Sequence, residues 1–159
     1  MTPSTAFHAR AGDIHASHRR SAMEQASDAS TIPQGIVSLK SPYPFRETVQ
    51  RLLAAFADKG IKVFATIDQR AEALAVGLSL PPTTLIVFGN AKAGTPLMLA
   101  NPQAGVDLPL KVLVYERSLG DVIVSFATAA EIGRRHGLAP ELIASIEASE
   151  RLVAGVLGQ

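Results

Sequence analysis

The segment from Gly89 to Thr95 holds the residues of this 159-residue sequence that are best suited to binding chemistry. Gly89 and Gly94 bracket Lys92, and Thr95-Pro96 predicts a helix start with Thr95 as the N-cap. Backbone N–H groups in such a turn, the helix dipole and the lysine could together hold a small anion. The segment is not a phosphate loop, because Gly94 is followed by Thr and Pro where that motif needs Lys and then Ser or Thr. We therefore expect a ligand-binding loop; the alternative is a structural turn whose glycines supply positive φ angles.

Three further polar residues complete the predicted ligand-binding set. Asn90 lies within the same loop. Asp68 ends a predicted strand, where its carboxylate could fix a ligand hydroxyl or act as a base, or instead cap the helix that follows. Lys111 shares a strand face with Leu113 and Tyr115 by alternation. It could therefore line a polar pocket or a dimer seam, or extend along the sheet into solvent.

No complete set of catalytic residues is visible in the sequence. His136 stands at a predicted helix C-terminus, where the helix dipole favours its protonated form, and Asp107 is expected to cap or to form an Asx turn. No serine has the Gly-x-Ser-x-Gly context of a nucleophile elbow. An enzyme would need Asp68 or His136 as a base and Lys92 as an electrostatic stabiliser, converging on one cleft. We predict no catalytic residues and lean against an enzyme.

The composition narrows the function classes. Lys and Arg number 15 against 14 Asp and Glu, and aromatic residues are only 5%, which disfavours a nucleic-acid binder. Cysteine is absent, so thiolate metal sites are excluded, and His15 with His18 makes too few ligands for a metal. No apolar run is long enough to span a membrane, and no signal peptide is visible. We expect a cytoplasmic protein without metal or cofactor.

The periodicity of apolar residues predicts alternating strands and helices. Phe45, Val49, Leu52, Leu53 and Phe56, for example, form one helical stripe. Strands are predicted at 35–40, 61–67, 83–88, 109–116 and 122–126, and helices at 44–59, 70–76, 95–100, 129–136 and from 140 onward. This order predicts an α+β two-layer sandwich, with a mainly antiparallel five-stranded sheet and helices packed on one face.

Two regions differ in composition. Residues 1–33 are rich in Ala, Ser, Thr, His and Arg and have few large apolar residues, so we predict a flexible leader. Met23 is an alternative start of translation. Residues 34–159 form the predicted domain.

Several landmarks of this domain resemble a known family. The landmarks are Lys59-Gly60 with Ile67-Asp68, Gly89-Asn90-x-Lys92-x-Gly94-Thr95 with Leu97-Met98, Leu108-Pro109-Leu110-Lys111, and Arg135-His136-Gly137. In unbroken order over about residues 35–138, they resemble the family catalogued as domain of unknown function 302 (DUF302). The resemblance implies a two-layer sandwich that forms homodimers, and it implies no activity.

Three functions follow from these observations. The first is a homodimeric module that binds a small polar or anionic molecule at Gly89–Thr95. The alternatives are an enzyme acting on a small anionic substrate, and a structural or interaction domain whose dimer surface is its function.

Overall fold

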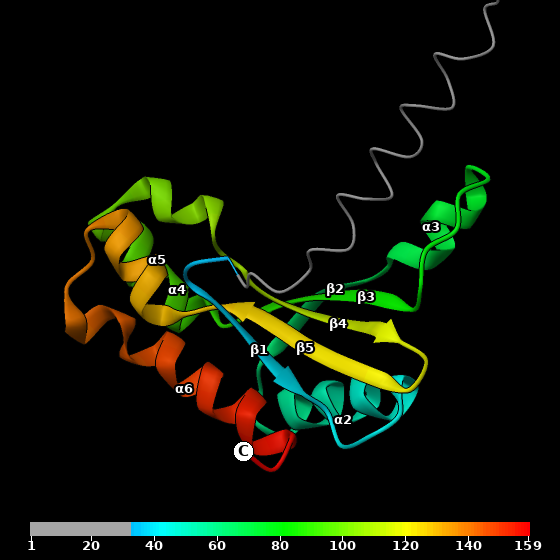
Figure 1. Ribbon diagram of the computed structural model, residues 1–159. Helices are drawn as coiled ribbons and strands as arrows, with labels where there is room; N and C mark the ends of the chain where they lie inside the picture. Colours follow the sequence, from blue (N-terminus) through cyan, green and yellow to red (C-terminus); the bar gives the residue numbers. More distant parts are fainter. Residues whose placement is uncertain (1–32) are drawn as a thin grey trace, which may run out of the picture. The chain divides into compact units, whose positions relative to one another are not determined.

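The computed structural model describes residues 33–159, so the prediction of a flexible leader over residues 1–33 lies, Pro33 apart, outside the described residues. The strands are β1 (Ile36–Lys40), β2 (Lys62–Asp68), β3 (Thr83–Gly89), β4 (Leu110–Ser118) and β5 (Asp121–Ala127) (Figure 1). The helices are α2 (Phe45–Asp58), α3 (Gln69–Ala75), α4 (Ala91–Ala100), the 3-10 helix η2 (Pro102–Val106), α5 (Ala129–His136) and α6 (Pro140–Val156).

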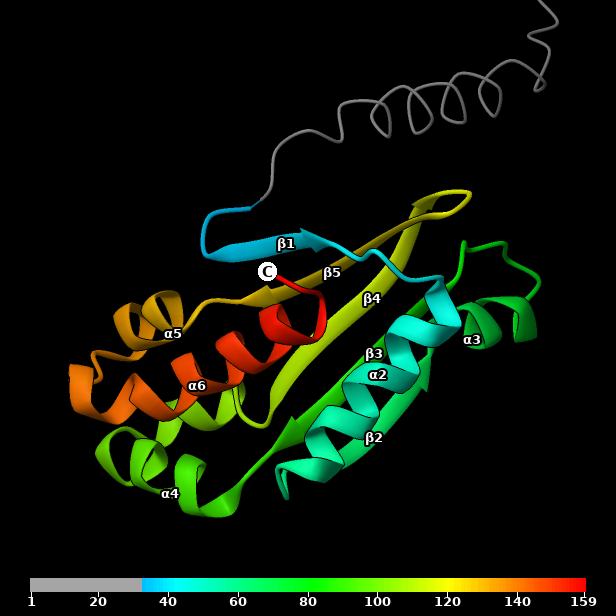
Figure 2. The same cartoon turned by 90° about the horizontal axis from the view of Figure 1, so that it is seen from below.

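The five strands form one sheet in the order β1-β5-β4-β3-β2, and every neighbouring pair is antiparallel. Helices α2 and α6 lie across one face of this sheet (Figure 2). The predicted α+β sandwich, with an antiparallel sheet and helices on one face, is confirmed.

The main core lies between the sheet and these two helices. Because side chains alternate along a strand, Ile86 and Phe88 of β3 face the helices together with Val112 of β4, which pairs with Ile86. Phe56 of α2 stacks on Phe88 with ring centroids 4.2 Å apart. Val153 of α6 joins the same cluster. Burial of these side chains, each worth about 1.5–3 kcal/mol, holds α2 and α6 on the sheet.

A second cluster closes the end of the sheet where β3 leads into α4. Leu97 of α4, Ala104 of η2, Ile132 of α5 and Ile146 of α6 are buried there together. Helix α5 ends as the sequence predicted, at His136, with Gly137 after it in the left-handed conformation at φ 59°.

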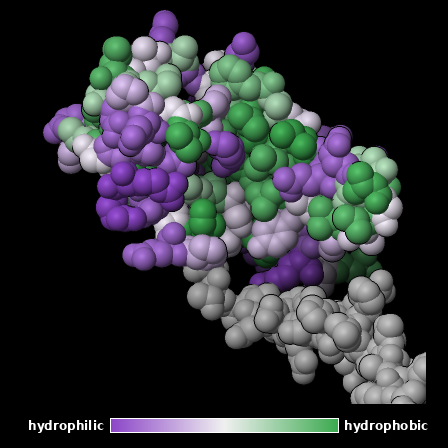
Figure 3. Space-filling view, turned by 90° about the horizontal axis from the view of Figure 1, so that it is seen from above, coloured by the Kyte–Doolittle hydropathy of each residue, from purple (hydrophilic) through white to green (hydrophobic). Residues whose placement is uncertain are grey.

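The opposite face of the sheet is not covered by any of the described helices. Ile67, Leu85 and Leu113 are cross-strand partners in one row across β2, β3 and β4. Tyr115 and Ile123 lie beside them on β4 and β5. Figure 3 shows apolar side chains gathered over this face.

Candidate functional site: a cavity between α4 and α6

The segment 89–95 folds differently from the predicted loop. Helix α4 begins at Ala91, so Gly94 and Thr95 lie inside the helix. Asn90 is the N-cap, and its side-chain oxygen accepts a hydrogen bond of 2.9 Å from the Lys92 N–H. The prediction that Thr95 caps this helix was wrong. Asn is as good a cap as Thr, and the Ala and Lys residues after it favour helix enough to start it earlier.

The two glycines have no special backbone role here. Neither Gly89 nor Gly94 has a positive φ, so the predicted alternative of a turn that needs left-handed glycines was also wrong. Instead, a side chain at either position would touch neighbours: Pro109 and Phe64 lie 3.5 and 3.6 Å from a Cβ added at Gly89, and Leu108 lies 3.8 Å from one added at Gly94.

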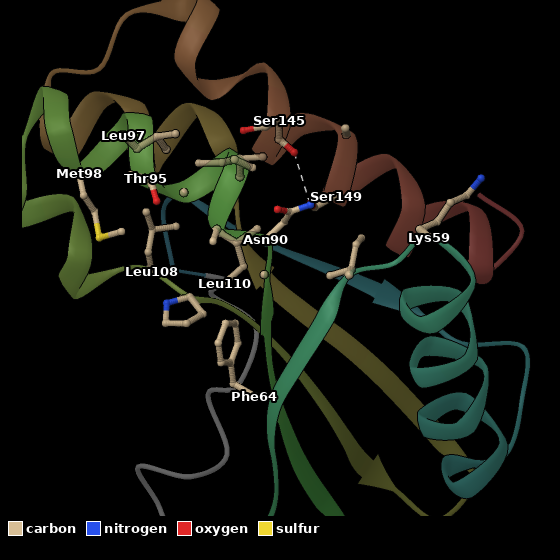
Figure 4. Close-up of a pocket in the computed structure, with 18 of the residues that line it drawn as sticks. Lys59, Phe64, Asn90, Thr95, Leu97, Met98, Leu108, Leu110, Ser145 and Ser149 are labelled. Carbon is tan, nitrogen blue, oxygen red and sulfur yellow. Dashed lines mark hydrogen bonds between the residues drawn. The ribbon is translucent and has the colours of Figure 1, made fainter.

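These glycines line a cavity of about 570 Å³ that opens to solvent. Helix α4 forms one wall, α6 another, and the ends of β2, β3 and β4 the floor (Figure 4). Most of the lining is apolar; it comprises Ile61, Phe64, Gly89, Ala91, Ala93, Gly94, Leu97, Met98, Leu108, Pro109, Leu110, Ile146, Ala148 and Leu152. A volume of this size is typical of sites for small organic molecules.

Five polar side chains complete the lining: Asn90, Thr95, Ser145, Ser149 and Lys59. Ser145 and Ser149 project from successive turns of α6, and the Ser149 hydroxyl donates to the Ser145 backbone carbonyl at 3.3 Å. Asn90 and Thr95 are exposed and carry a carboxamide and a hydroxyl. Lys59, just after α2, is the one charged residue among the described residues that line the cavity.

The structure brings together four of the seven predicted ligand-binding residues: Gly89, Asn90, Gly94 and Thr95 all line this cavity. Lys92 belongs to the same helix but is exposed and does not line the cavity.

Asp68 and Lys111 lie apart from this cavity. Asp68 pairs with Thr84 at the opposite end of β2 from Lys62, the partner of Gly89, which places it about 20 Å along the strand. Its carboxylate accepts the Ala71 N–H at 3.0 Å, so Asp68 caps α3, the alternative that the sequence left open.

Lys111 lies on the open sheet face and also borders a second cavity of about 380 Å³. Its ammonium donates to the backbone carbonyls of Asp107 and Pro109 at 3.3 and 3.1 Å. Because Asp68 lies at the far end of β2, it does not share a cleft with Lys92. The other base of the enzyme hypothesis, His136, is paired with Asp107.

Asp107 is an ion-pair residue and not the predicted helix cap or Asx turn. Its carboxylate accepts from Arg135 at 2.9 and 3.0 Å and from His136 Nε2 at 2.6 Å. Burial raises the pKa of Asp107, but the hydrogen bond from His136 and the charge of Arg135 outweigh it, so the pKa lies below the ordinary 3.8. Asn101 also donates to the His136 carbonyl at 2.9 Å. These contacts tie the chain after α4 to α5, next to the cavity.

Comparison with known proteins assigns the family. Residues 37–155 match the family described as "Domain of unknown function DUF302". The chain belongs to the DUF302 family. A crystal structure of an uncharacterized conserved protein DUF302 from Bacillus stearothermophilus superposes with a TM-score of 0.67 at 18% identity, covering 79% of this chain and 97% of that one. That likeness supports the fold alone.

Two curated relatives of this DUF302 domain carry a functional name. "Fluoride-specific ion channel FluC 1" of Brucella suis biovar 1 (strain 1330) is 39% identical over 110 residues, which are 69% of this chain and 43% of that protein. "Fluoride-specific ion channel FluC 2" of Brucella melitensis biotype 1 (strain ATCC 23456 / CCUG 17765 / NCTC 10094 / 16M) is 39% identical over 110 residues, 69% of this chain and 41% of that one. The DUF302 chain thus spans less than half the length of these relatives.

Residues 33–159 of the DUF302 domain contain neither a helix that could span a membrane nor a cluster of metal-ligating side chains. No helix in that range is long and apolar enough to cross a lipid bilayer. No group of three or more His, Asp or Glu side chains there is placed to hold a metal ion.

Sequence reasoning missed the residues that α6 and the end of α2 bring to the cavity of the DUF302 domain. Ser145 and Ser149 are separated from Gly89 by more than fifty residues, and Lys59 by thirty. The four-residue spacing of Ser145 and Ser149 could have placed these two serines on one face of a helix. No local signal could have shown that this face meets α4.

Proposed function

We propose that this DUF302 domain is a binding module that holds a small, largely apolar molecule in the cavity between α4 and α6. The observation that carries the proposal is the lining itself, in which apolar side chains dominate and a few polar groups stand at defined positions. This combination is characteristic of small-molecule sites, where apolar area supplies affinity and polar groups fix orientation.

The proposal keeps Gly89, Asn90, Gly94 and Thr95 as binding residues and changes the expected ligand. A free inorganic anion would have to give up its hydration for walls that offer few donors, and that desolvation is costly. An apolar body gains free energy from the same walls. Lys92, Asp68 and Lys111 are left out of the site because they do not line it.

Two measurements test this function. Native mass spectrometry of the gently purified protein detects a retained ligand, and NMR of the backbone amides follows a titration with 1-decanol. We expect amide shifts concentrated on α4 and α6. Ala148 lines the cavity from an exposed position on α6, whereas Ala144, one turn earlier, is exposed but does not line it. Ala148→Trp should therefore weaken binding about tenfold or more, and Ala144→Trp should leave it unchanged. Equal affinities of the two variants would place the ligand elsewhere.

We also propose that the domain works as a homodimer joined through the open sheet face. The row Ile67, Leu85 and Leu113 is apolar, and an exposed apolar patch on a sheet is a common association surface. The family resemblance supports the same assembly. In sedimentation velocity, we expect a dimer that Leu113→Lys converts to monomer. Leu119→Lys, at the fully exposed β4–β5 turn, is the matched control and should stay dimeric.

The relatives named as fluoride-specific ion channels favour a second candidate, an accessory domain that acts on a fluoride channel. In this case the domain itself need not bind fluoride, because the apolar cavity suits that small, strongly hydrated anion poorly. Fluoride efflux from vesicles that contain such a channel, measured with and without this domain, tests the candidate. A rate that does not respond to the domain would count against it.

A further inference from the structure

The charge distribution around the α4–α6 cavity is one-sided. Lys59 is the one charged side chain among the described lining residues, and no Asp or Glu is among them. Asp58 and Glu147 neighbour lining residues in the sequence, but neither lines the cavity. Among the lining residues, a cationic group would therefore find no carboxylate, and an anionic group could pair only with Lys59.

Lys59 lies at one end of the cavity. Lys59 follows the last turn of α2 and is exposed. Figure 4 places it at one end of the cavity, while Met98 and Leu108 lie at the other end. In Figure 4 the Lys59 ammonium points away from the other lining side chains, so it can pair only with a ligand group that reaches the solvent-exposed rim.

We infer that the ligand of this cavity is an amphiphilic acid, whose apolar body lies between α4 and α6 and whose anionic head pairs with Lys59. This inference rests on the proposed function and specifies its ligand. The head stays at the solvent-exposed rim, so it keeps part of its hydration, and the ion pair avoids the cost of a fully buried charge. The apolar body supplies most of the affinity.

Two other lysines lie near the site, and Lys92 is the reference for the experiment. The Lys62 ammonium lies over the Phe64 ring, 4.9 Å from its centroid, and Lys62 does not line the cavity. Lys92 is exposed on α4 and does not line it either. Neutralising Lys92 therefore changes the net charge as much as neutralising Lys59 does, without changing the cavity.

The experiment compares decanoate with 1-decanol, which share an apolar body and differ in the head, by calorimetry at neutral pH below the micelle concentration. The wild-type protein should bind decanoate more tightly than decanol by about 1.5-fold to fivefold, the range of an exposed charge pair. Lys59→Gln should abolish that preference and leave decanol binding unchanged. Lys92→Gln should keep it. Lys59→Glu should bind decylammonium more tightly than decanoate.

The outcomes separate the two levels of the proposal. Equal binding of decanoate and decanol by the wild type, or a preference that survives Lys59→Gln, would overturn the acidic head and leave the binding function standing. Binding of neither probe would overturn the binding function and the inference together. Circular dichroism and thermal unfolding of each variant confirm that a loss of binding is not a loss of fold.

Discussion

Helices α3 and α4 have the same kind of N-cap but different roles in the fold. Helix α3 follows β2 and helix α4 follows β3. Each is capped by an Asx side chain, Asp68 at 3.0 Å and Asn90 at 2.9 Å from a backbone N–H. Yet α3 buries no residue, whereas α4 buries Leu97 and walls the cavity. Capping therefore explains why both segments are helical, and only packing against α5 and α6 explains why one of them forms a site.

The largest expected difference is between two leucines of these helices. Leu97 is 1% exposed and Leu74 is 57% exposed. Leu97→Ala should lower the free energy of unfolding by about 2–5 kcal/mol, because it leaves a void in the second core cluster. Leu74→Ala should change it by less than about 0.5 kcal/mol. Urea denaturation of both variants measures the free energy of unfolding. Similar losses of stability in the two variants would contradict the view that α3 packs weakly.

The next effect comes from the ion pairs that tie the α4 side to α5. Asp107→Ala should cost about 1–3 kcal/mol at neutral pH, because Arg135 and the nearly buried His136 lose their carboxylate partner. The folded pKa of Asp107 is lowered below 3.8. The unfolded state therefore binds the proton more readily, and the stabilisation is present above about pH 5 and is lost as the pH falls through the folded pKa.

Urea denaturation of the wild type and of Asp107→Ala at neutral and at acidic pH checks this sign. The gap between the two proteins should narrow on acidification. A gap that is independent of pH would mean that the loss comes from packing and not from the charge.

The smallest expected effect separates the two caps. Asn90→Ala should cost about 1 kcal/mol of global stability, the usual value for a lost N-cap. Asp68→Ala removes an equivalent bond from a helix without buried residues, so its global cost should stay below about 0.5 kcal/mol. Hydrogen exchange should instead show faster exchange confined to α3. A global loss in Asp68→Ala as large as that in Asn90→Ala would contradict this difference.

Much of the fold could be predicted because its signals are local. The stripe of Phe45, Leu52 and Phe56 predicted α2, and the five predicted strands correspond to the strands of the sheet. The start of α4 was predicted too late, because Thr95-Pro96 also has the pattern of a helix start, whereas the helix begins after Asn90, where Ala and Lys favour it.

The candidate site was predictable only in part. Gly89, Asn90, Gly94 and Thr95 are close in sequence and line one cavity, so local reasoning found them. Asp68 and Lys111 looked equally suitable, since a residue type carries no information on distance. The antiparallel register carries Asp68 to the far end of β2, and the alternation of side chains along β4 places Lys111 on the sheet face opposite Leu110. The same reasoning missed the partners of Asp107, which lie 28 and 29 residues away.

The sequence by itself determined the family, the order of strands and helices, the residues that end α5, and four members of the candidate site. All of these depend on backbone preferences, periodicity or motifs within short stretches of chain. Only the tertiary structure decided that the cavity is apolar, that Lys59, Ser145 and Ser149 belong to it, and that Lys92 does not. A cavity exists where distant segments meet, and its chemistry is set by whichever side chains the packing brings to that place.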